Sequence, residues 1–206
     1  MLSVLDTRLF PDSITILKTP ESQDYIYPIH KNGSSSLMAS GISIVDPSDY
    51  KSIETIQVFV REPYQRFLSG VNTYLKHNFN KNRDSLLDFI SEFLFINNHF
   101  CPQFYWLVNL QRFTTANILL RDVSSLKELT PKHKNFENAN EYQYLNEVFE
   151  NHKKLHFYLA LDKVLYWDML NKTVTMPEIC SSLKQKYPDV YTEVIERSKQ
   201  ICGVLG

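Results

Sequence analysis

Residues 25–37 read Tyr-Ile-Tyr-Pro-Ile-His-Lys-Asn-Gly-Ser-Ser-Ser-Leu, an extended, apolar-alternating run that stops at a lysine, a glycine and three serines. This order predicts a strand that turns tightly into a helix. The first N–H groups and the dipole of such a helix suit an oxyanion such as phosphate or sulfate. Lys31 adds a cation, and Gly33 permits a backbone conformation that a side chain would block. The ATPase pattern GxxxxGK[ST] is absent, because here the lysine precedes the glycine.

Residues 57–71 form a second segment of the same kind. Gln-Val-Phe-Val at 57–60 is β-rich, and Pro63 suits the first turn of a helix, where its missing N–H costs nothing. Apolar side chains then recur at helical spacing, with Arg66, Ser69 and Thr73 on the other face. Arg61 ends the strand, at the edge where open α/β sheets bind ligands. If the two strands are parallel neighbours, Arg61 lies beside the first loop.

Together these segments resemble the cofactor signature of sulfotransferases that use 3′-phosphoadenosine 5′-phosphosulfate (PAPS), in particular the carbohydrate sulfotransferases. The family's PK-x-G-S-(S/T)-(S/T)-L loop is matched at residues 30–37, with His30 in place of the proline. Its V-R-(D/E)-P-(Y/F)-x-R-(F/L)-x-S segment is matched at residues 60–69. Residues 99–103, His-Phe-Cys-Pro-Gln, are similar to its H-(W/F)-x-P-Q element, and residues 162–166 match its late D-(F/Y)-x-L-(F/Y) helix loosely.

The resemblance implies an activity and a set of site residues. PAPS would be the cofactor, adenosine 3′,5′-bisphosphate the product, and no metal would be needed. The acceptor would be a hydroxyl group, of a carbohydrate before a lipid, a peptide tyrosine or a small metabolite. Arg61 and Ser69 would bind the 3′-phosphate. The 5′-phosphosulfate would be bound by the first loop, which comprises Lys31, Asn32, Gly33, Ser34, Ser35 and Ser36.

The chemistry assigns two catalytic candidates. Sulfuryl transfer is an in-line displacement whose loose transition state is stabilised mainly by positioning and electrostatics. Lys31 is the candidate that stabilises the leaving group. His99 is the candidate base, because an imidazole pKa near 6.5 suits proton transfer at neutral pH, and His30 is the reserve. A role for His99 in acceptor binding or in holding a loop stays open, as does a structural ion pair for Arg66.

Other interpretations remain. Lys-Asn-Gly-Ser is also an ordinary surface turn, and Gln103 suits a structural or acceptor-orienting role. The other four histidines, His77, His133, His152 and His156, are expected to be solvated. A P-loop-like kinase or nucleotide hydrolase is disfavoured by the missing GK[ST] and by the lack of an obvious metal-binding aspartate after a core strand. A module that binds the nucleotide without catalysis is the third possibility.

Composition supports an ordinary globular protein. The 206 residues are 43% hydrophobic and 22% charged, which favours one domain over residues 1–206. A net charge of −1 offers no basic field for nucleic acid. We expect no membrane span and no signal peptide, and thus a cytoplasmic protein, of bacterial or viral type or cut from a longer chain. Cys101, Cys180 and Cys202 suggest neither a disulfide framework nor a zinc site.

The predicted fold is α/β, a P-loop-like three-layer sulfotransferase fold with a central, mostly parallel sheet flanked by helices. Residues 42–55 are expected to connect, 97–103 to form a loop, and the segment through Asn140 to be exposed. Strands are expected at 14–17, 24–30, 56–60 and 115–120. Helices are expected at 35–41, 63–78, 84–96, 141–153, 159–170, 177–186 and 188–201.

Overall fold

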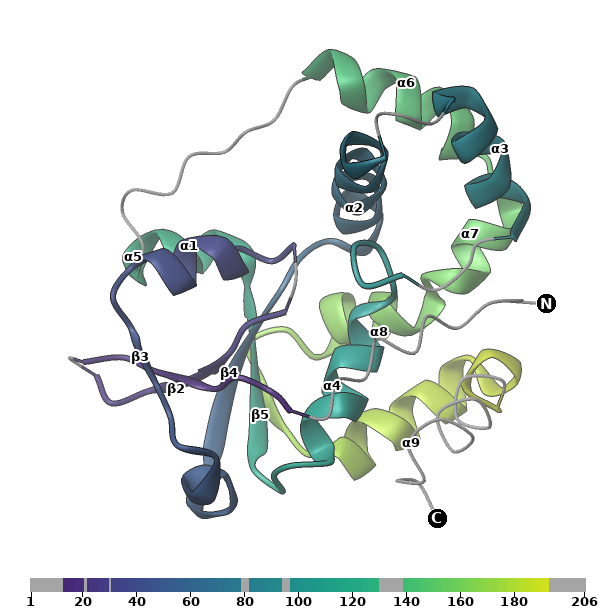
Figure 1. Ribbon diagram of the computed structural model, residues 1–206. Helices are drawn as coiled ribbons and strands as arrows, with labels where there is room; N and C mark the ends of the chain where they lie inside the picture. Colours follow the sequence, from purple (N-terminus) through teal and green to yellow (C-terminus); the bar gives the residue numbers. More distant parts are fainter. Residues whose placement is uncertain are drawn as a thin grey trace.

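A central β-sheet positions the first two motif segments, which follow strands of that sheet. The computed structural model describes residues 13–20, 22–29, 31–78, 82–93, 97–129 and 139–192 (Figure 1). Within them lies a six-stranded sheet of order β3-β1-β2-β4-β5-β6. Its strands are β1 (Leu17–Lys18), β2 (Tyr25–Tyr27), β3 (Ser43–Ile44), β4 (Thr55–Val60), β5 (Asn117–Asp122) and β6 (Thr173–Val174).

Strand directions make the sheet mixed. The central strands β2, β4 and β5 run parallel, and β4 pairs with β5 along its whole length. The outer strands are antiparallel: β1 to both β2 and β3, and β6 to β5. The protein is therefore of the α/β class, and the expectation of a mostly parallel sheet holds for the three central strands only.

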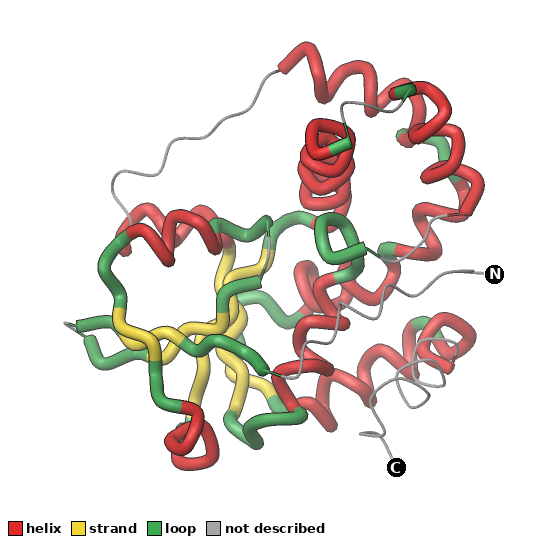
Figure 2. Tube along the Cα trace, in the orientation of Figure 1, coloured by secondary structure: helices red, strands yellow, loops and turns green. Residues whose placement is uncertain are grey.

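Helices cover both faces of the sheet (Figures 1 and 2). They are α1 (Ser34–Ala39), α2 (Pro63–His77), α3 (Arg83–Phe93), α4 (Gln103–Gln111), α5 (Leu126–Leu129), α6 (Ala139–Phe149), α7 (Lys153–Tyr158), α8 (Ala160–Asp168) and α9 (Met176–Lys186), with 3-10 turns η2 (Pro47–Ser52) and η3 (Val123–Ser125). On one face, Leu37 of α1 and Leu126 of α5 pack on Ile26 and Phe59. On the other face, α2, α4, α8 and α9 bury a larger apolar core.

Alternation along β4 explains the two-sided core. Ile56, Val58 and Val60 face the larger cluster, whereas Phe59 faces α1 and α5. Successive side chains of a strand point to opposite faces, so one short run of apolar residues serves both layers. The carboxyl end of β4 is thereby fixed from both sides, and it leads directly into Arg61.

Local capping sets where the main helices begin. Pro63 opens α2, and the Glu62 carboxylate accepts a hydrogen bond from Gln65 N–H at 2.7 Å. Thr175 and Glu178 form a capping box at the start of α9. Both beginnings are close to those expected from the sequence, at 63 and 177.

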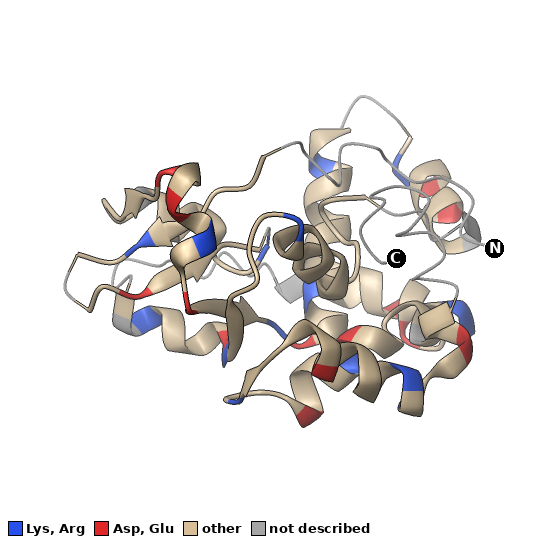
Figure 3. Ribbon diagram, turned by 90° about the horizontal axis from the view of Figure 1, so that it is seen from below, with Lys and Arg blue, Asp and Glu red and all other residues tan. Residues whose placement is uncertain are grey.

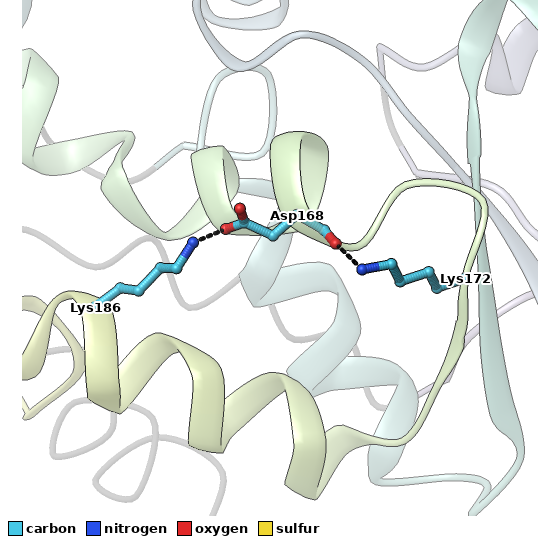
Figure 4. Close-up of polar contacts among 3 residues, drawn as sticks. All are labelled: Asp168, Lys172 and Lys186. Atoms are coloured by element: carbon cyan, nitrogen blue, oxygen red, sulfur yellow. Dashed lines mark hydrogen bonds and ion pairs between the residues drawn. The ribbon is translucent and has the colours of Figure 1, made fainter.

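The C-terminal helices are also joined at the surface (Figure 4). The Lys186 ammonium of α9 lies 2.6 Å from the Asp168 carboxylate of α8, and Lys172 Nζ donates to the Asp168 carbonyl at 2.7 Å. Both side chains of the ion pair are exposed, so the pair contributes about 0–1 kcal/mol. Figure 3 shows Lys and Arg interspersed with Asp and Glu in the view from below.

Several elements differ from expectation. Residues 42–55 contain β3 and η2 instead of a plain connection, residues 159–170 hold α8 with α7 before it, and β5 begins two residues later than expected. Helix α4 was not expected at all. No helix in the described part of the chain is long and apolar enough to cross a bilayer. Residues 188–192 are helical, and the rest of the helix expected at 188–201 lies outside the described residues.

Candidate functional site

The loop between β2 and α1 has an unusual backbone. Lys31 has φ 68° and Gly33, which precedes α1, has φ 79°, so both are left-handed. A Cβ on Gly33 would press on the end of the Leu126 side chain in α5, which could shift, so the left-handed backbone is the main reason for glycine at this position. Lys31 is half-buried, and burial, followed by the nearby Arg66 cation, lowers the pKa of its ammonium group.

The buried side chain of Asn32 holds this loop to the rest of the protein. Its side chain is 1% exposed, and Nδ2 donates to the Phe59 carbonyl at 2.8 Å and to Gln103 Oε1 at 2.6 Å. The side chain thus faces the end of β4 and the start of α4. Asn32 holds the loop in place, and its side chain is turned toward the protein interior.

Gln103 connects the loop to Arg61. Its Oε1 accepts the Arg61 N–H at 2.9 Å and its Nε2 donates to the Arg61 carbonyl at 2.9 Å. One carboxamide therefore satisfies both backbone groups of Arg61, as a neighbouring strand would. Gln103 is fully buried, so these groups have little access to water.

Asp162 completes the same set of contacts from α8. Its carboxylate accepts the N–H of Gln103 at 2.6 Å and of Phe104 at 3.0 Å, which are the first two N–H groups of α4. Burial raises the pKa of Asp162, and the Arg66 cation and the α4 hydrogen bonds oppose that rise. We call Asn32, Arg61, Gln103 and Asp162 the Gln103 network.

Arg66 lies beneath this network. Its side chain is 1% exposed, and Nη1 donates to the Cys101 carbonyl. The sequence placed Arg66 on the face of α2 opposite its apolar stripe, and at Arg66 that face is buried against the loop that carries His99. The hydrogen bond to Cys101 ties α2 to this loop, and the charge of Arg66 acts on Lys31, His99 and Asp162. The structural ion pair considered for Arg66 stays a prediction.

His99 is half-buried in the loop between α3 and α4. Its ring Nδ1 lies 2.8 Å from Asn97 Oδ1, which also accepts the His99 backbone N–H at 2.9 Å. Burial lowers the pKa of His99 to about 4, and the charges of Lys31, His77 and Arg66 add to the shift. The ring centroids of His77 and His99 are 5.5 Å apart. His99 is therefore neutral at pH 7 and electrostatically coupled to Lys31.

Asp122 stands at the same sheet edge as Arg61. It is the last residue of β5 and pairs with Val60 in register. Its carboxylate accepts Ser124 N–H at 2.7 Å and Tyr166 O–H at 2.7 Å. Burial raises the pKa of Asp122, but these hydrogen bonds and the Arg61 cation outweigh it and the pKa is lowered. Asp122 is an aspartate at the end of a core strand that the sequence argument did not single out, and among the described residues no group of three or more possible ligands surrounds it to hold a metal ion.

The remaining predicted residues lie around this centre. Ser34, Ser35 and Ser36 form the first turn of α1, and Ser69 is half-buried on α2. Within the described residues these serines are not members of the Gln103 network. The reserve base, His30, lies outside the described residues, as does His133. His152, expected to be solvated, caps α7 by accepting the Leu155 N–H at 3.2 Å.

The centre combines the cations Lys31, Arg61 and Arg66 with the carboxylates Asp122 and Asp162. Among the residues with described positions, no group of three or more His, Cys, Asp or Glu side chains is arranged to hold a metal ion. Lys31 and Arg61 lie in the loops that follow β2 and β4 at the carboxyl edge of the sheet, an arrangement that can bind anions, and the buried Arg66 adds positive charge from α2. Comparisons of the chain with protein-family models, with curated proteins and with solved structures gave no match.

Proposed function

We propose that the chain is a sulfotransferase that moves a sulfuryl group from PAPS to a hydroxyl acceptor, in first place a carbohydrate. The observation that carries the proposal is the Gln103 network. It joins the four sequence segments that resemble the family, although Asn32 and Gln103 alone are 71 residues apart. Chance matches to separate motifs have no reason to converge on one hydrogen-bonded centre.

The residues at this centre fit an anionic nucleotide. Lys31 lies in the loop between β2 and α1 and Arg61 in the loop between β4 and α2, so the two cations could hold two phosphate groups of one ligand. Gly33 has the left-handed φ of 79°, which would allow neighbouring backbone N–H groups of the loop to bind a phosphosulfate. The chain has a net charge of only −1, so anion binding would depend on this local cluster of cations and backbone N–H groups.

PAPS supplies the sulfuryl group, and the chain's own residues supply charge and a proton acceptor. Neutral His99 would take the proton of the acceptor hydroxyl as the hydroxyl oxygen forms its bond to sulfur. Lys31 would offset the charge that develops on the departing phosphate as the bond between sulfur and that oxygen breaks. Such stabilisation of developing charge is the main source of catalysis in transfers of this kind. Arg61, with Ser69, would hold the 3′-phosphate.

Calorimetric titration with adenosine 3′,5′-bisphosphate tests the proposal. We expect micromolar binding by the wild type and loss of at least tenfold in affinity in Arg61→Ala, because one charged contact to phosphate contributes about 1.5–3 kcal/mol. Arg83→Ala on α3 is the matched control and should bind as the wild type does. Turnover with radiolabelled PAPS and a panel of sugar, lipid, tyrosine and metabolite acceptors then identifies the acceptor class.

Asp122 makes a nucleotide kinase the second candidate. A carboxylate at the end of a parallel strand beside a phosphate loop is where nucleotide kinases hold magnesium. Here, however, both oxygens of Asp122 already accept hydrogen bonds and Arg61 balances its charge. Binding of ATP with magnesium, and not of the bisphosphate, would favour this candidate. Tight bisphosphate binding without turnover on any acceptor would favour a non-catalytic nucleotide-binding module.

A further inference from the structure

Asn97 makes two contacts to the same residue. Its side chain is 8% exposed, and Oδ1 lies 2.9 Å from the backbone N of His99 and 2.8 Å from ring Nδ1. Asn97 is not part of any of the matched motifs. Within the described residues, its hydrogen bonds are made to His99 and to the turn formed by Phe100 and Cys101.

These contacts determine which ring nitrogen carries the proton. A backbone N–H can only donate, so the Asn97 atom that faces it must be the amide oxygen and not the amide nitrogen. The same oxygen faces Nδ1, and an amide oxygen can only accept. In neutral His99, therefore, Nδ1 bears the hydrogen and Nε2 bears the lone pair.

We infer that Asn97 is a positioning residue that holds His99 in the Nδ1–H tautomer, so that Nε2 is the nitrogen that takes the acceptor's proton. The catalytic meaning of this inference rests on the proposed sulfuryl transfer. The tautomer itself rests only on the geometry of the loop. A histidine side chain in water favours the Nε2–H tautomer, so the protein has to impose this one.

An asparagine also suits the charge around His99. Lys31, His77 and Arg66 act on the ring from the β2–α1 loop and from α2. A neutral oxygen orients the ring without adding an anion, so the ring stays uncharged at neutral pH. An aspartate in the same place would accept the same two hydrogen bonds but would stabilise the imidazolium and raise the pKa of His99.

The loop has anchors that do not involve the Asn97 side chain. The Asn97 carbonyl accepts the N–H groups of Phe100 at 3.1 Å and Cys101 at 2.6 Å. The His99 carbonyl abuts Gly70 of α2 so closely that a Cβ there would collide with it. A change at the Asn97 side chain should therefore act on the His99 ring more than on the path of the backbone.

Long-range proton–nitrogen NMR correlation on the full chain with labelled histidine tests the inference. The His99 signals are assigned by their loss in His99→Gln. We expect a protonated Nδ1 and a bare Nε2 in the wild type at pH 7, a shift toward the Nε2–H tautomer in Asn97→Ala, and the wild-type tautomer in Asn97→Asp with a raised His99 pKa. A wild-type His99 in the Nε2–H form, or an unchanged tautomer in Asn97→Ala, would overturn the inference.

Kinetics separate this inference from the proposed function. Asn97→Ala should lower kcat about 10- to 100-fold with little change in KM for PAPS. The expected loss is smaller than the 10²–10⁴-fold that a general base contributes, because the base itself remains. Asn97→Asp should recover part of that loss and shift the pH–rate profile to higher pH. An Nδ1–H tautomer in a chain without sulfuryl transfer would support the inference on the ring and overturn the function. Full sulfuryl transfer by a chain with His99 in the Nε2–H tautomer would support the function and overturn the inference on the ring.

Discussion

Lys31 combines a left-handed backbone with a half-buried ammonium group whose pKa burial lowers. A lysine rarely adopts φ 68° without a reason, because its Cβ then crowds the backbone at a cost of about 1–2 kcal/mol. In this loop the conformation carries the chain from β2 into α1 within a few residues. Lys31 is therefore the residue at which we expect a substitution to reduce sulfuryl transfer with the least effect on folding.

Removal of the Lys31 side chain should abolish most transfer and leave the fold intact. We expect Lys31→Ala to lower kcat about 10²–10³-fold, the usual effect of losing one group that stabilises developing charge. Lys31→Gly should do the same, and its backbone adopts φ 68° without strain, so agreement between the two variants excludes loop distortion. The control is Lys172→Ala, which removes an exposed cation from the turn between α8 and β6 (Figure 4). Normal transfer by both Lys31 variants would end the assignment of this lysine to the leaving group.

His99 predicts a pH dependence of stability. Its pKa is about 4 in the folded protein and about 6.5 in an unfolded chain, so between these values the unfolded state binds more protons. Stability from this group is thus full above about pH 6.5 and is lost as the pH falls toward 4. Urea unfolding at several pH values should show that His99→Gln loses less unfolding free energy across this interval than the wild type does. Parallel losses in both proteins would mean that His99 is not held neutral.

The residues of the centre differ in how far the sequence could identify them. Lys31, Gly33 and Arg61 follow strands, and their local pattern placed them at the sheet edge. Asn97 and Asp122 were missed because their roles depend on what lies across from them in space. His77 was expected to be solvated and is exposed, and its ring also lies 5.5 Å from that of His99. This contact between α2 and a loop could not be inferred from spacing along the chain.

At the scale of elements, α4 shows where periodicity fails. Helix α2 was predicted with its limits nearly correct, because it has an apolar stripe and a proline at its start. Helix α4 is buried on nearly every side and has no polar face to set a helical period. Strands β3 and β6 have two residues each and exist through pairing with β1 and β5. Local sequence carries little signal for such strands.

The contact between α4 and β4 predicts a large loss of stability in Gln103→Leu. Leucine fills a similar volume but leaves the buried Arg61 N–H and C=O and one donor of Asn32 without their partner. At about 1–3 kcal/mol for an unsatisfied buried group, we expect a loss of about 3 kcal/mol in urea unfolding. Gln111→Leu, at the other end of the same helix, should change stability by less than about 1 kcal/mol. Equal effects of the two changes would show that the Gln103 contacts contribute little.

In the molecule as a whole, the helical layers on the two faces of the sheet differ in size. The short helices α1 and α5 cover one face with a small cluster, and the larger core fills the other. The candidate site lies where the loop before α1 meets the start of α2 and α4. A ligand there would contact elements from both layers, so binding should stabilise the fold as a unit.

Adenosine 3′,5′-bisphosphate should therefore raise the melting temperature of the full chain. At a ligand concentration of about 100 times Kd the expected stabilisation is about 2.7 kcal/mol. For a chain of this size that corresponds to a rise of about 5–10 °C, measured by thermal unfolding followed by circular dichroism. Arg61→Ala should melt near the wild-type temperature without ligand and respond weakly to it. No rise in the wild type at millimolar ligand would count against a site of this class.

The hydrogen bonds from the Gln103 side chain to Arg61 are made to the main chain of Arg61. They therefore do not depend on which amino acid occupies position 61. Selection can exchange that side chain, and with it the charge offered to a ligand, while the scaffold beneath stays locked. Position 103 has no such latitude, since glutamate would turn an oxygen toward the Arg61 carbonyl and shorter side chains would fall out of reach. A library randomised at both positions should return many residues at 61 when sorted for folding alone, and glutamine almost uniformly at 103.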